Sequence, residues 1–310
     1  MFQRLSTFSP LNPIRRISSV LGGSPASRMT SDSGFRRVRV RVRVVLLSLA
    51  ASLVLIACST VQTTKPGFIG IDRAQRMSSL VTAEQMEAGA NAAYADVLTQ
   101  AKREGQLNAK PQMTQRVQRI AKRLIPHVDV YREDALNWDW QVNVIDSDQL
   151  NAWAMPGGKI AFYSGIIEQL QLTDAEIAAI MGHEIAHALR EHSRERASQQ
   201  AVQGLLIGAV GTAAGVGQGG QALADMVAQM TFGLPNSRAH ETESDRMGVE
   251  LMARAGYDPR ASIKVWQKMA IATGGGGGGS PEWLSTHPSN DTRIADLTDY
   301  SARVLPLYKP

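Results

Sequence analysis

Apolar residues recur over most of the chain with the three- and four-residue spacing of helices that bury one face. Two of these segments open on capping boxes, Thr82 to Gln85 and Thr173 to Glu176. Pro126 and Gly256 are placed to end two others. The predicted helices cover 82–104, 112–125, 173–198, 237–255 and a stretch from Asp291 onward.

Extended segments are fewer and lie together in the middle of the chain. Apolar and polar residues alternate from Trp138 to Val144, which predicts a half-buried strand. Residues 151–155 and 159–163 predict two short strands around the turn at 156–158. The chain is therefore expected to be predominantly helical, in the α+β class, with one small sheet.

Three stretches lack the pattern of a regular core element. Residues 59–80 have no clear periodicity and are interpreted as a tether. Residues 204–220 are apolar and glycine-rich but too short to span a bilayer, so a mobile helical hairpin or flap is favoured over a buried helix. The six consecutive glycines at 274–279 predict a flexible loop.

Composition narrows the class of protein further. The chain has 310 residues, 44% of them hydrophobic, and a single cysteine, which excludes an internal disulfide. The net charge of +5 comes from residues 1–57, which hold nine arginines and one acid, Asp32. The remainder has 24 basic and 27 acidic residues, so nothing in it indicates nucleic-acid binding.

The N-terminal region resembles a bacterial lipoprotein signal. A basic run is followed by fourteen uncharged residues, 44–57, which end directly before Cys58. Cleavage before Cys58, together with lipidation of Cys58, would anchor the protein to a membrane and place the rest of the chain outside the cytoplasm. The alternative is a short membrane anchor with an incidental cysteine. Ser59, where an aspartate would favour retention in the inner membrane, favours the outer membrane.

These features give a domain plan. Residues 1–57 are expected to be a leader and signal peptide, although Met29 offers a start codon with a more usual leader length. Residues 58–80 are expected to be the lipidated cysteine and tether, and 81–310 a folded domain that contains the motif described next.

The sequence His183-Glu184-Ile-Ala-His187 carries the chemistry. Histidines four apart project from one face of a helix and can bind one zinc ion, whereas Glu184 is offset and can act on a water without binding the metal. Zinc lowers the pKa of water and a carboxylate accepts the proton, which is metal-assisted hydrolysis.

Zinc in a catalytic site needs a third protein ligand. Glu241 and Asp245, four apart on a later predicted helix, are interpreted as that ligand and as an acceptor for the ring N–H of a ligating histidine. Glu243 is expected to be solvated. Gly248 and Gly182 are candidates for a close approach of the two helices, or are neutral.

The spacing from His183 to Asp245 resembles the gluzincin family of zinc metallopeptidases that contains the CAAX prenyl protease and HtpX, and within it the periplasmic lipoproteins of the LoiP and BepA type. The blocks at 151–165 and 286–297 strengthen the resemblance, which covers roughly residues 80–300. It implies a zincin-like fold, one Zn²⁺ per chain, and an endopeptidase that degrades unfolded or misassembled envelope proteins. The transmembrane helices of the membrane enzymes are missing from this sequence.

The resemblance also implies roles for particular residues. A substrate strand would pair with an edge formed by Asn151, Ala152, Trp153, Ala154 and Met155. Glu184 would be the base that later protonates the leaving amine. His287 would either stabilise the oxyanion, occupy the fourth zinc position and keep the enzyme latent, or be an ordinary loop histidine. Arg293 is a further candidate near the site.

Three other histidines, His127, His192 and His240, have no partner that the sequence identifies and are interpreted as structural or surface residues. A rival function is a chaperone-like or assembly-factor lipoprotein with a structural or latent zinc site. The presence of Glu184 favours the enzyme, because a structural site needs no general base.

Overall fold

The computed structural model describes residues 58–206, 219–274, 282–288 and 291–310. Residues 275–279 of the predicted flexible loop and 207–218 of the predicted flap lie outside the described residues. The strands are β1 (Cys58–Val61), β2 (Gln75–Ser78), β3 (Gln141–Ile145), β4 (Ala152–Met155) and β5 (Lys159–Tyr163). The helices are α2 (Ala83–Arg103), α3 (Pro111–Leu124), α4 (Ser164–Gln169), α5 (Asp174–Leu189), α6 (His192–Leu206), α8 (Gly219–Ala228), α9 (Arg238–Arg254), α10 (Ala261–Gly274), α11 (Glu282–Thr286) and α12 (Asp291–Val304). Short 3-10 and π turns are η1 (Ile125–Val130), η2 (Glu133–Asn137), η4 (Gln229–Gly233) and η5 (Leu305–Leu307).

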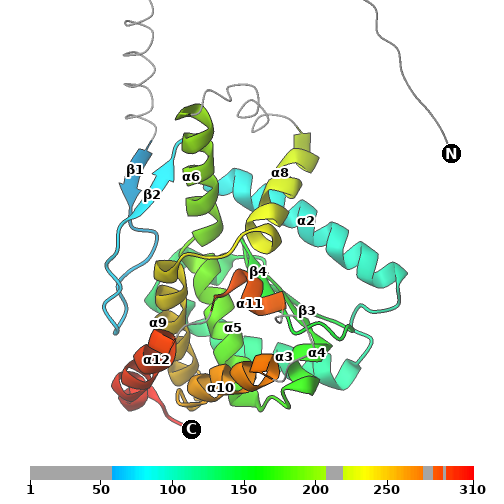
Figure 1. The fold of residues 1–310 in the computed structure, drawn as a ribbon, viewed down its shortest axis with the longest axis vertical. Helices are drawn as coiled ribbons and strands as arrows, with labels where there is room; N and C mark the ends of the chain where they lie inside the picture. The colour runs from blue at the N-terminus through cyan, green and yellow to red at the C-terminus, as the bar shows by residue number, and fades with distance from the viewer. Residues whose placement is uncertain (1–57, 207–218, 275–281, 289–290) are drawn as a thin grey trace, which may run out of the picture. The chain divides into compact units, whose positions relative to one another are not determined.

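The strands form a three-stranded sheet with the order β3-β5-β4 and a two-stranded sheet of β1 and β2. In Figure 1 the two sheets lie apart from each other, β1 and β2 together and β3 and β4 among the helices. β3 runs parallel to β5, and β4 is antiparallel to β5, with Ala152 opposite Phe162 and Met155 opposite Lys159. Gly157 and Gly158 have φ of +74° and +81° in the turn between β4 and β5, a backbone region that favours glycine. The predicted strands at 151–155 and 159–163 are confirmed.

The strand predicted from Trp138 begins later, at Gln141. Trp138 and Trp140 stack on each other, with ring centroids 5.5 Å apart, and the Trp140 indole N–H donates to the Ala135 carbonyl. These contacts hold the first residues of the alternating pattern in an irregular turn, so tertiary packing overrides the local β pattern.

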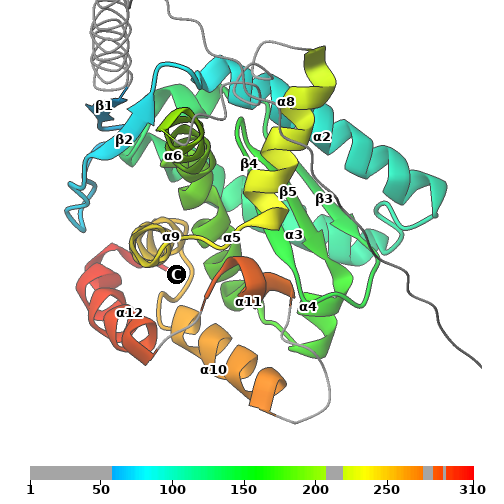
Figure 2. The same cartoon turned by 45° about the horizontal axis from the view of Figure 1, so that its top comes forward.

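Helix α5 is the central element, and every residue from Glu176 to Leu189 is buried. One apolar core surrounds it with residues of α3, the sheet, α9, α10 and α12. A second core lies between α2, the strands and α8. Figure 2 shows α8 beside α2 and in front of the strands, with α5 and α9 next to each other below α6. The predominantly helical α+β class is confirmed.

The predicted helix ends are largely confirmed. Thr82 and Thr173 both form complete capping boxes, and Gly256 follows α9 with a φ of +73°. The prediction of one helix from 173 to 198 is wrong. The chain turns between α5 and α6, where Glu191 adopts a φ of +51°, and this turn redirects the following residues toward α5.

The interpretation of residues 59–80 as a tether is also wrong. β1 and β2 form an antiparallel pair in this stretch, and Ile71, Gln75 and Met77 are buried. We call residues 58–80 the N-terminal strap. The strap is held mainly by polar contacts rather than by one apolar face. Its buried residues therefore stand singly among polar ones, and the sequence shows no regular spacing of apolar residues.

Helices α5 and α9 approach closely at two glycines. A Cβ atom added to Gly248 would lie 2.8 Å from the backbone nitrogen of His183, and one added to Gly182 would lie 2.9 Å from the Gly248 carbonyl oxygen. The close approach expected at these glycines is confirmed, and it brings the two helices that carry the candidate ligands together.

Gly248→Ala is therefore expected to destabilise the protein by about 1–3 kcal/mol, because the added methyl group overpacks the interface. Urea unfolding of the metal-free protein measures this. Gly220→Ala on α8, where an added Cβ has no atom within 4 Å, is the matched control and should be neutral or slightly stabilising. Equal stability of Gly248→Ala and wild type would contradict the close-approach explanation.

No helix within the described ranges is both long and apolar enough to cross a membrane.

Candidate metal centre

Four buried side chains bring one possible ligand atom each to within 4.8 Å of one another. His183 and His187 come from α5, Glu241 from the first turn of α9, and His287 from the residue after α11. The Nε2 atoms of His183 and His187 are 3.0 Å apart. The Glu241 carboxylate lies 3.5 Å from the first of these nitrogens and 3.4 Å from the second. The predicted ligands therefore meet at one point.

Asp245 fixes the orientation of the His183 ring through the nitrogen that faces away from the cluster. His183 Nδ1 lies 2.9 Å from Asp245 Oδ1, and the Arg293 guanidinium contacts both oxygens of Asp245 at 2.7 Å. A carboxylate only accepts, so Nδ1 carries the ring proton and Nε2 presents its lone pair to the cluster. Asp245 thus lies where the sequence predicted an acceptor for a ligating histidine, and Arg293 lies behind it.

Electrostatics separates the two α5 histidines. Burial lowers the pKa of His183, but the hydrogen bonds with Asp245 and Glu241 outweigh it and raise that pKa to about 9. Burial lowers the pKa of His187 well below its usual value, despite the hydrogen bond with Glu241. Burial raises the pKa of Glu241, but the charges of His287 and Arg293 hold it well below the usual range. The centre therefore keeps an ionised carboxylate beside a neutral imidazole.

The donor set fits zinc. Imidazole nitrogens and a carboxylate oxygen are its usual ligands, and a tetrahedral site uses four of them. Both imidazoles have their Nδ1 atoms engaged elsewhere and turn their Nε2 atoms toward each other at 3.0 Å, where a zinc ion would displace the Nε2 proton of His183 and bind both nitrogens. His183, His187, Glu241 and His287 form a zinc site.

Glu184 lies beside this cluster without belonging to it. The side chain is buried, and its Oε1 accepts a hydrogen bond of 2.9 Å from the Trp283 indole N–H. The same oxygen is 3.4 Å from His287 Nε2. A buried carboxylate next to a zinc site, held by one neutral donor, is suited to proton transfer.

His287 contacts the centre through its other nitrogen. Nδ1 lies 3.0 Å from Glu241 Oε1 and 3.2 Å from His183 Nε2, and it also contacts the Asn236 side-chain amide at 3.3 Å. This position argues against an ordinary loop histidine. Of the two functional alternatives, it corresponds to the fourth ligand position.

The predicted substrate edge is β4. Within the described residues its only strand partner is β5, so it is an edge strand, but its residues are buried. The Trp153 ring packs edge-on against Phe232 of η4, with centroids 5.2 Å apart. Pairing of a substrate with Asn151 to Met155 remains a prediction.

Sequence reasoning missed several residues around the centre. Glu243, expected to be solvated, is only 6% exposed. His192 and His240, interpreted as structural or surface residues, are both buried, and each makes a polar contact: His192 with His187, and His240, through Nε2, with Glu195. No sequence pattern indicates Trp283, whose contact with Glu184 joins residues 99 positions apart. His192 is five residues from His187 in the sequence. The two side chains can meet only because the helix is interrupted between them.

Comparisons with known proteins agree with this geometry. The model of peptidase family M48 matches residues 111–301. The mitochondrial metalloendopeptidase OMA1 of Bos taurus is 36% identical over 51% of this chain and 32% of its own length. OMA1 of Saccharomyces cerevisiae is 32% identical over 59% of this chain and 53% of its own length. The β-barrel assembly-enhancing protease of Escherichia coli is 27% identical over 64% of this chain and 40% of its own length. The chain thus spans about a third to a half of the curated relatives that it matches.

Proposed function

The chain belongs to peptidase family M48, and from this premise we propose that it is a zinc metalloendopeptidase. The observation that carries the proposal is the buried Glu184 carboxylate directly beside, but not among, the four zinc ligands. A site that served only to hold the fold together has no use for such a base.

The geometry divides the work of peptide hydrolysis among the residues. Zinc, when bound, supplies Lewis acidity that polarises the scissile carbonyl and acidifies the attacking water. Glu184 accepts the proton of that water at its carboxylate and delivers it to the leaving amine. Trp283 holds Glu184 in place through its indole N–H, and Asp245 with Arg293 keeps the His183 lone pair directed at the centre.

The simplest test is cleavage of an unfolded protein, such as reduced casein, by the purified full chain. Proteolysis that a chelator abolishes and stoichiometric zinc restores is the expected result. Suppression of aggregation without any cleavage would instead support the rival function, a chaperone-like lipoprotein with a structural or latent zinc site. The complete set of four protein ligands is the one observation that favours that rival.

His287 decides between a latent and an open site. Because a catalytic zinc site needs one position free of protein ligands, the His287 ring blocks catalysis where it lies. His287→Ala is therefore expected to raise kcat/KM several-fold while the three other ligands retain zinc. The measurement is the initial rate of casein cleavage at equal zinc occupancy.

A fall in kcat of about 10²-fold or more in His287→Ala, with zinc retained, would contradict this and assign His287 to oxyanion stabilisation. Asn236→Ala is the matched control for packing. It removes a neighbour that contacts His287 Nδ1 at 3.3 Å but leaves every zinc ligand in place.

For location and substrates, we infer a lipoprotein of the bacterial envelope that degrades unfolded or misassembled envelope proteins. The apolar stretch that ends directly before Cys58 supports lipidation, and Ser59 supports the outer membrane. The name of the Escherichia coli relative links that protein to β-barrel assembly, which agrees with an assignment to the periplasmic branch of the family.

Cys58→Ser tests the inferred location. The wild type should be labelled by a radioactive fatty acid and have the mass of a chain that begins at Cys58, whereas the variant should lose the label and keep residues 44–57 uncleaved. A wild type that takes up no label and keeps residues 44–57 would favour an uncleaved membrane anchor instead.

A further inference from the structure

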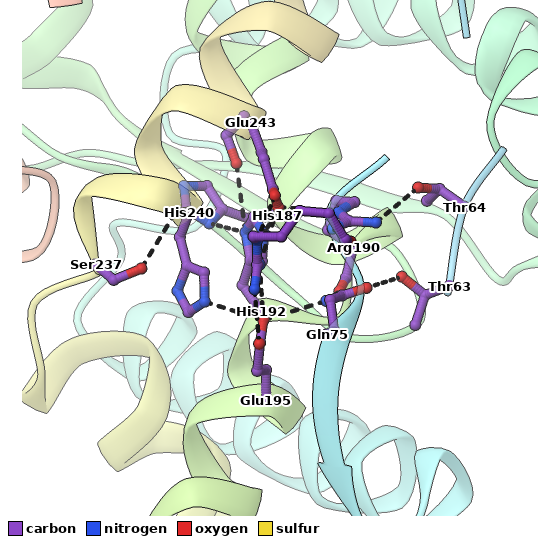
Figure 3. A network of polar contacts seen from close by, with 12 residues as sticks. Thr63, Thr64, Gln75, His187, Arg190, His192, Glu195, Ser237, His240 and Glu243 are labelled. Atoms are coloured by element: carbon purple, nitrogen blue, oxygen red, sulfur yellow. Dashed lines mark hydrogen bonds and ion pairs between the residues drawn. The ribbon is translucent and has the colours of Figure 1, made fainter. Parts of the chain in front are cut away.

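The second ring nitrogen of the zinc ligand His187 faces another histidine. His187 Nδ1 lies 2.9 Å from His192 Nδ1, and both side chains are buried (Figure 3). His192 has no role in the hydrolysis mechanism proposed above. Histidines that bind zinc are usually oriented by an acceptor on the far nitrogen, and for His187 that acceptor is a neutral imidazole rather than a carboxylate.

The contacts of His192 define where the protons lie. Its Nε2 is 3.0 Å from Glu243 Oε2. Because a carboxylate only accepts, the Nε2 atom of His192 carries the proton and its Nδ1 accepts one from His187 Nδ1. His187 is left with its lone pair on Nε2, the atom that faces the other ligands. The hydrogen-bond pattern thus assigns both tautomers.

The turn between α5 and α6 makes this contact. In one continuous helix, residues five apart point roughly 140° away from each other around the axis. The chain instead leaves α5 at Leu189 and passes through Glu191 with a φ of +51°. His192 then begins α6 and points back at His187. The backbone conformation that sequence reasoning failed to predict is the one that builds the pair.

Glu243 is held by two arginines. Arg190 Nε, at the end of α5, is 3.0 Å from Glu243 Oε2 and is itself completely buried. Arg73 contacts both oxygens of Glu243 and, through Nη1 and Nη2, both oxygens of Glu195 at 2.8 and 2.9 Å. Arg73 belongs to the N-terminal strap, which precedes the residues that the family model matches.

Other strap residues join the same network. Arg190 donates to the Arg73 carbonyl at 2.8 Å and to the Thr64 hydroxyl at 3.1 Å, and the Gln75 amide donates to the Arg190 carbonyl. Figure 3 shows Thr64 and Gln75 of the strap beside Arg190, close to His187 and His192. Without the strap, the buried Glu243 and Glu195 would lose their shared cation, which is an unfavourable state for two carboxylates.

We propose that His192 is a positioning residue for the zinc ligand His187, that Glu243 holds His192 in the required tautomer, and that Arg73 of the N-terminal strap holds Glu243. The zinc site is then incomplete without a segment that lies outside the matched peptidase region. The proposal relies on the proposed function only for the identity of the metal.

The test compares two buried glutamates of α9 in the full-length protein. Glu243→Gln removes the charge that orients His192. Glu250→Gln is the matched control, because Glu250 is also buried on α9 and also binds the strap, accepting from the backbone N–H of Phe68 at 3.0 Å, but does not contact His192. Competition with a chromophoric chelator measures zinc affinity, and casein cleavage at saturating zinc measures kcat and KM.

Glu243→Gln is expected to weaken zinc binding about 10- to 100-fold and to lower kcat with little change in KM. Glu250→Gln is expected to lower the unfolding midpoint but keep wild-type zinc affinity. Unchanged zinc affinity in Glu243→Gln, or an equal loss in Glu250→Gln, overturns the proposal, because the effect would then be absent or a general loss of stability.

Arg73→Lys provides a second route if Glu243→Gln does not fold. Lysine keeps the positive charge, and the Arg73 side chain is 33% exposed, but a single ammonium cannot bridge Glu243 and Glu195 as the guanidinium does. Weaker zinc binding in this variant supports the proposal. Wild-type zinc affinity in Arg73→Lys would contradict the proposed role of the N-terminal strap.

Discussion

Glu184→Gln is expected to lower kcat by about 10²- to 10⁴-fold and to leave zinc content unchanged. Glutamine has nearly the shape of glutamate and can still accept from the Trp283 indole, so the buried site keeps its packing. It cannot accept a proton from water, and the base is lost. Zinc should remain, because Glu184 is not one of the four converging ligands. Casein cleavage and metal analysis of the same sample measure both quantities.

Glu176→Gln is the matched control for that substitution. Glu176 is also buried on α5, but it caps the helix at Thr173 and pairs with Lys268. This variant should keep wild-type kcat, since a glutamine also completes a capping box. If Glu184→Gln cleaves casein at the wild-type rate while holding zinc, another group must be the base and the mechanism is wrong.

Glu241→Ala is expected to weaken zinc binding by more than about 100-fold. Loss of a residue that only orients a zinc ligand weakens binding by up to about 100-fold, and loss of a ligand itself should weaken it more. Glu241 is the only acidic member of the donor cluster, and the charges of His287 and Arg293 keep it ionised despite its burial. Proteolysis should disappear at the zinc concentration that saturates the wild type. Zinc titration of the variant, followed by casein cleavage, measures the effect.

Excess zinc separates this variant from Glu184→Gln. Activity of Glu241→Ala should recover in part as zinc is raised, whereas Glu184→Gln should stay inactive at every zinc concentration. Full activity and normal zinc affinity in Glu241→Ala would remove Glu241 from the ligand set.

Local sequence signals were sufficient for the parts of the site that lie on regular helices. The capping box at Thr173 predicted the start of α5, and the four-residue spacing of His183 and His187 predicted that both lie on one face of it. The same spacing on α9 predicted that Glu241 and Asp245 both face the centre. Gly182 and Gly248 were recognised because a close helix approach needs residues without side chains. Each of these inferences uses only the geometry of a helix and the chemistry of zinc.

The residues that were missed depend on contacts between distant segments. Glu243 looks like a solvated residue of an acidic helix start, and only the fold brings Arg73, 170 residues away, against it. Trp283 meets Glu184 across 99 residues. His192 is near His187 in sequence, but the contact depends on a turn with a left-handed glutamate, a conformation that propensity does not predict.

The central claim is that His183, His187 and Glu241 bind one zinc ion next to Glu184. Anomalous diffraction at the zinc absorption edge, from crystals of the purified protein, tests it most directly. The account predicts one strong peak per chain within bonding distance of His183 Nε2, His187 Nε2 and a Glu241 oxygen. Crystals without a peak, or a peak that Glu241 does not contact, would contradict it.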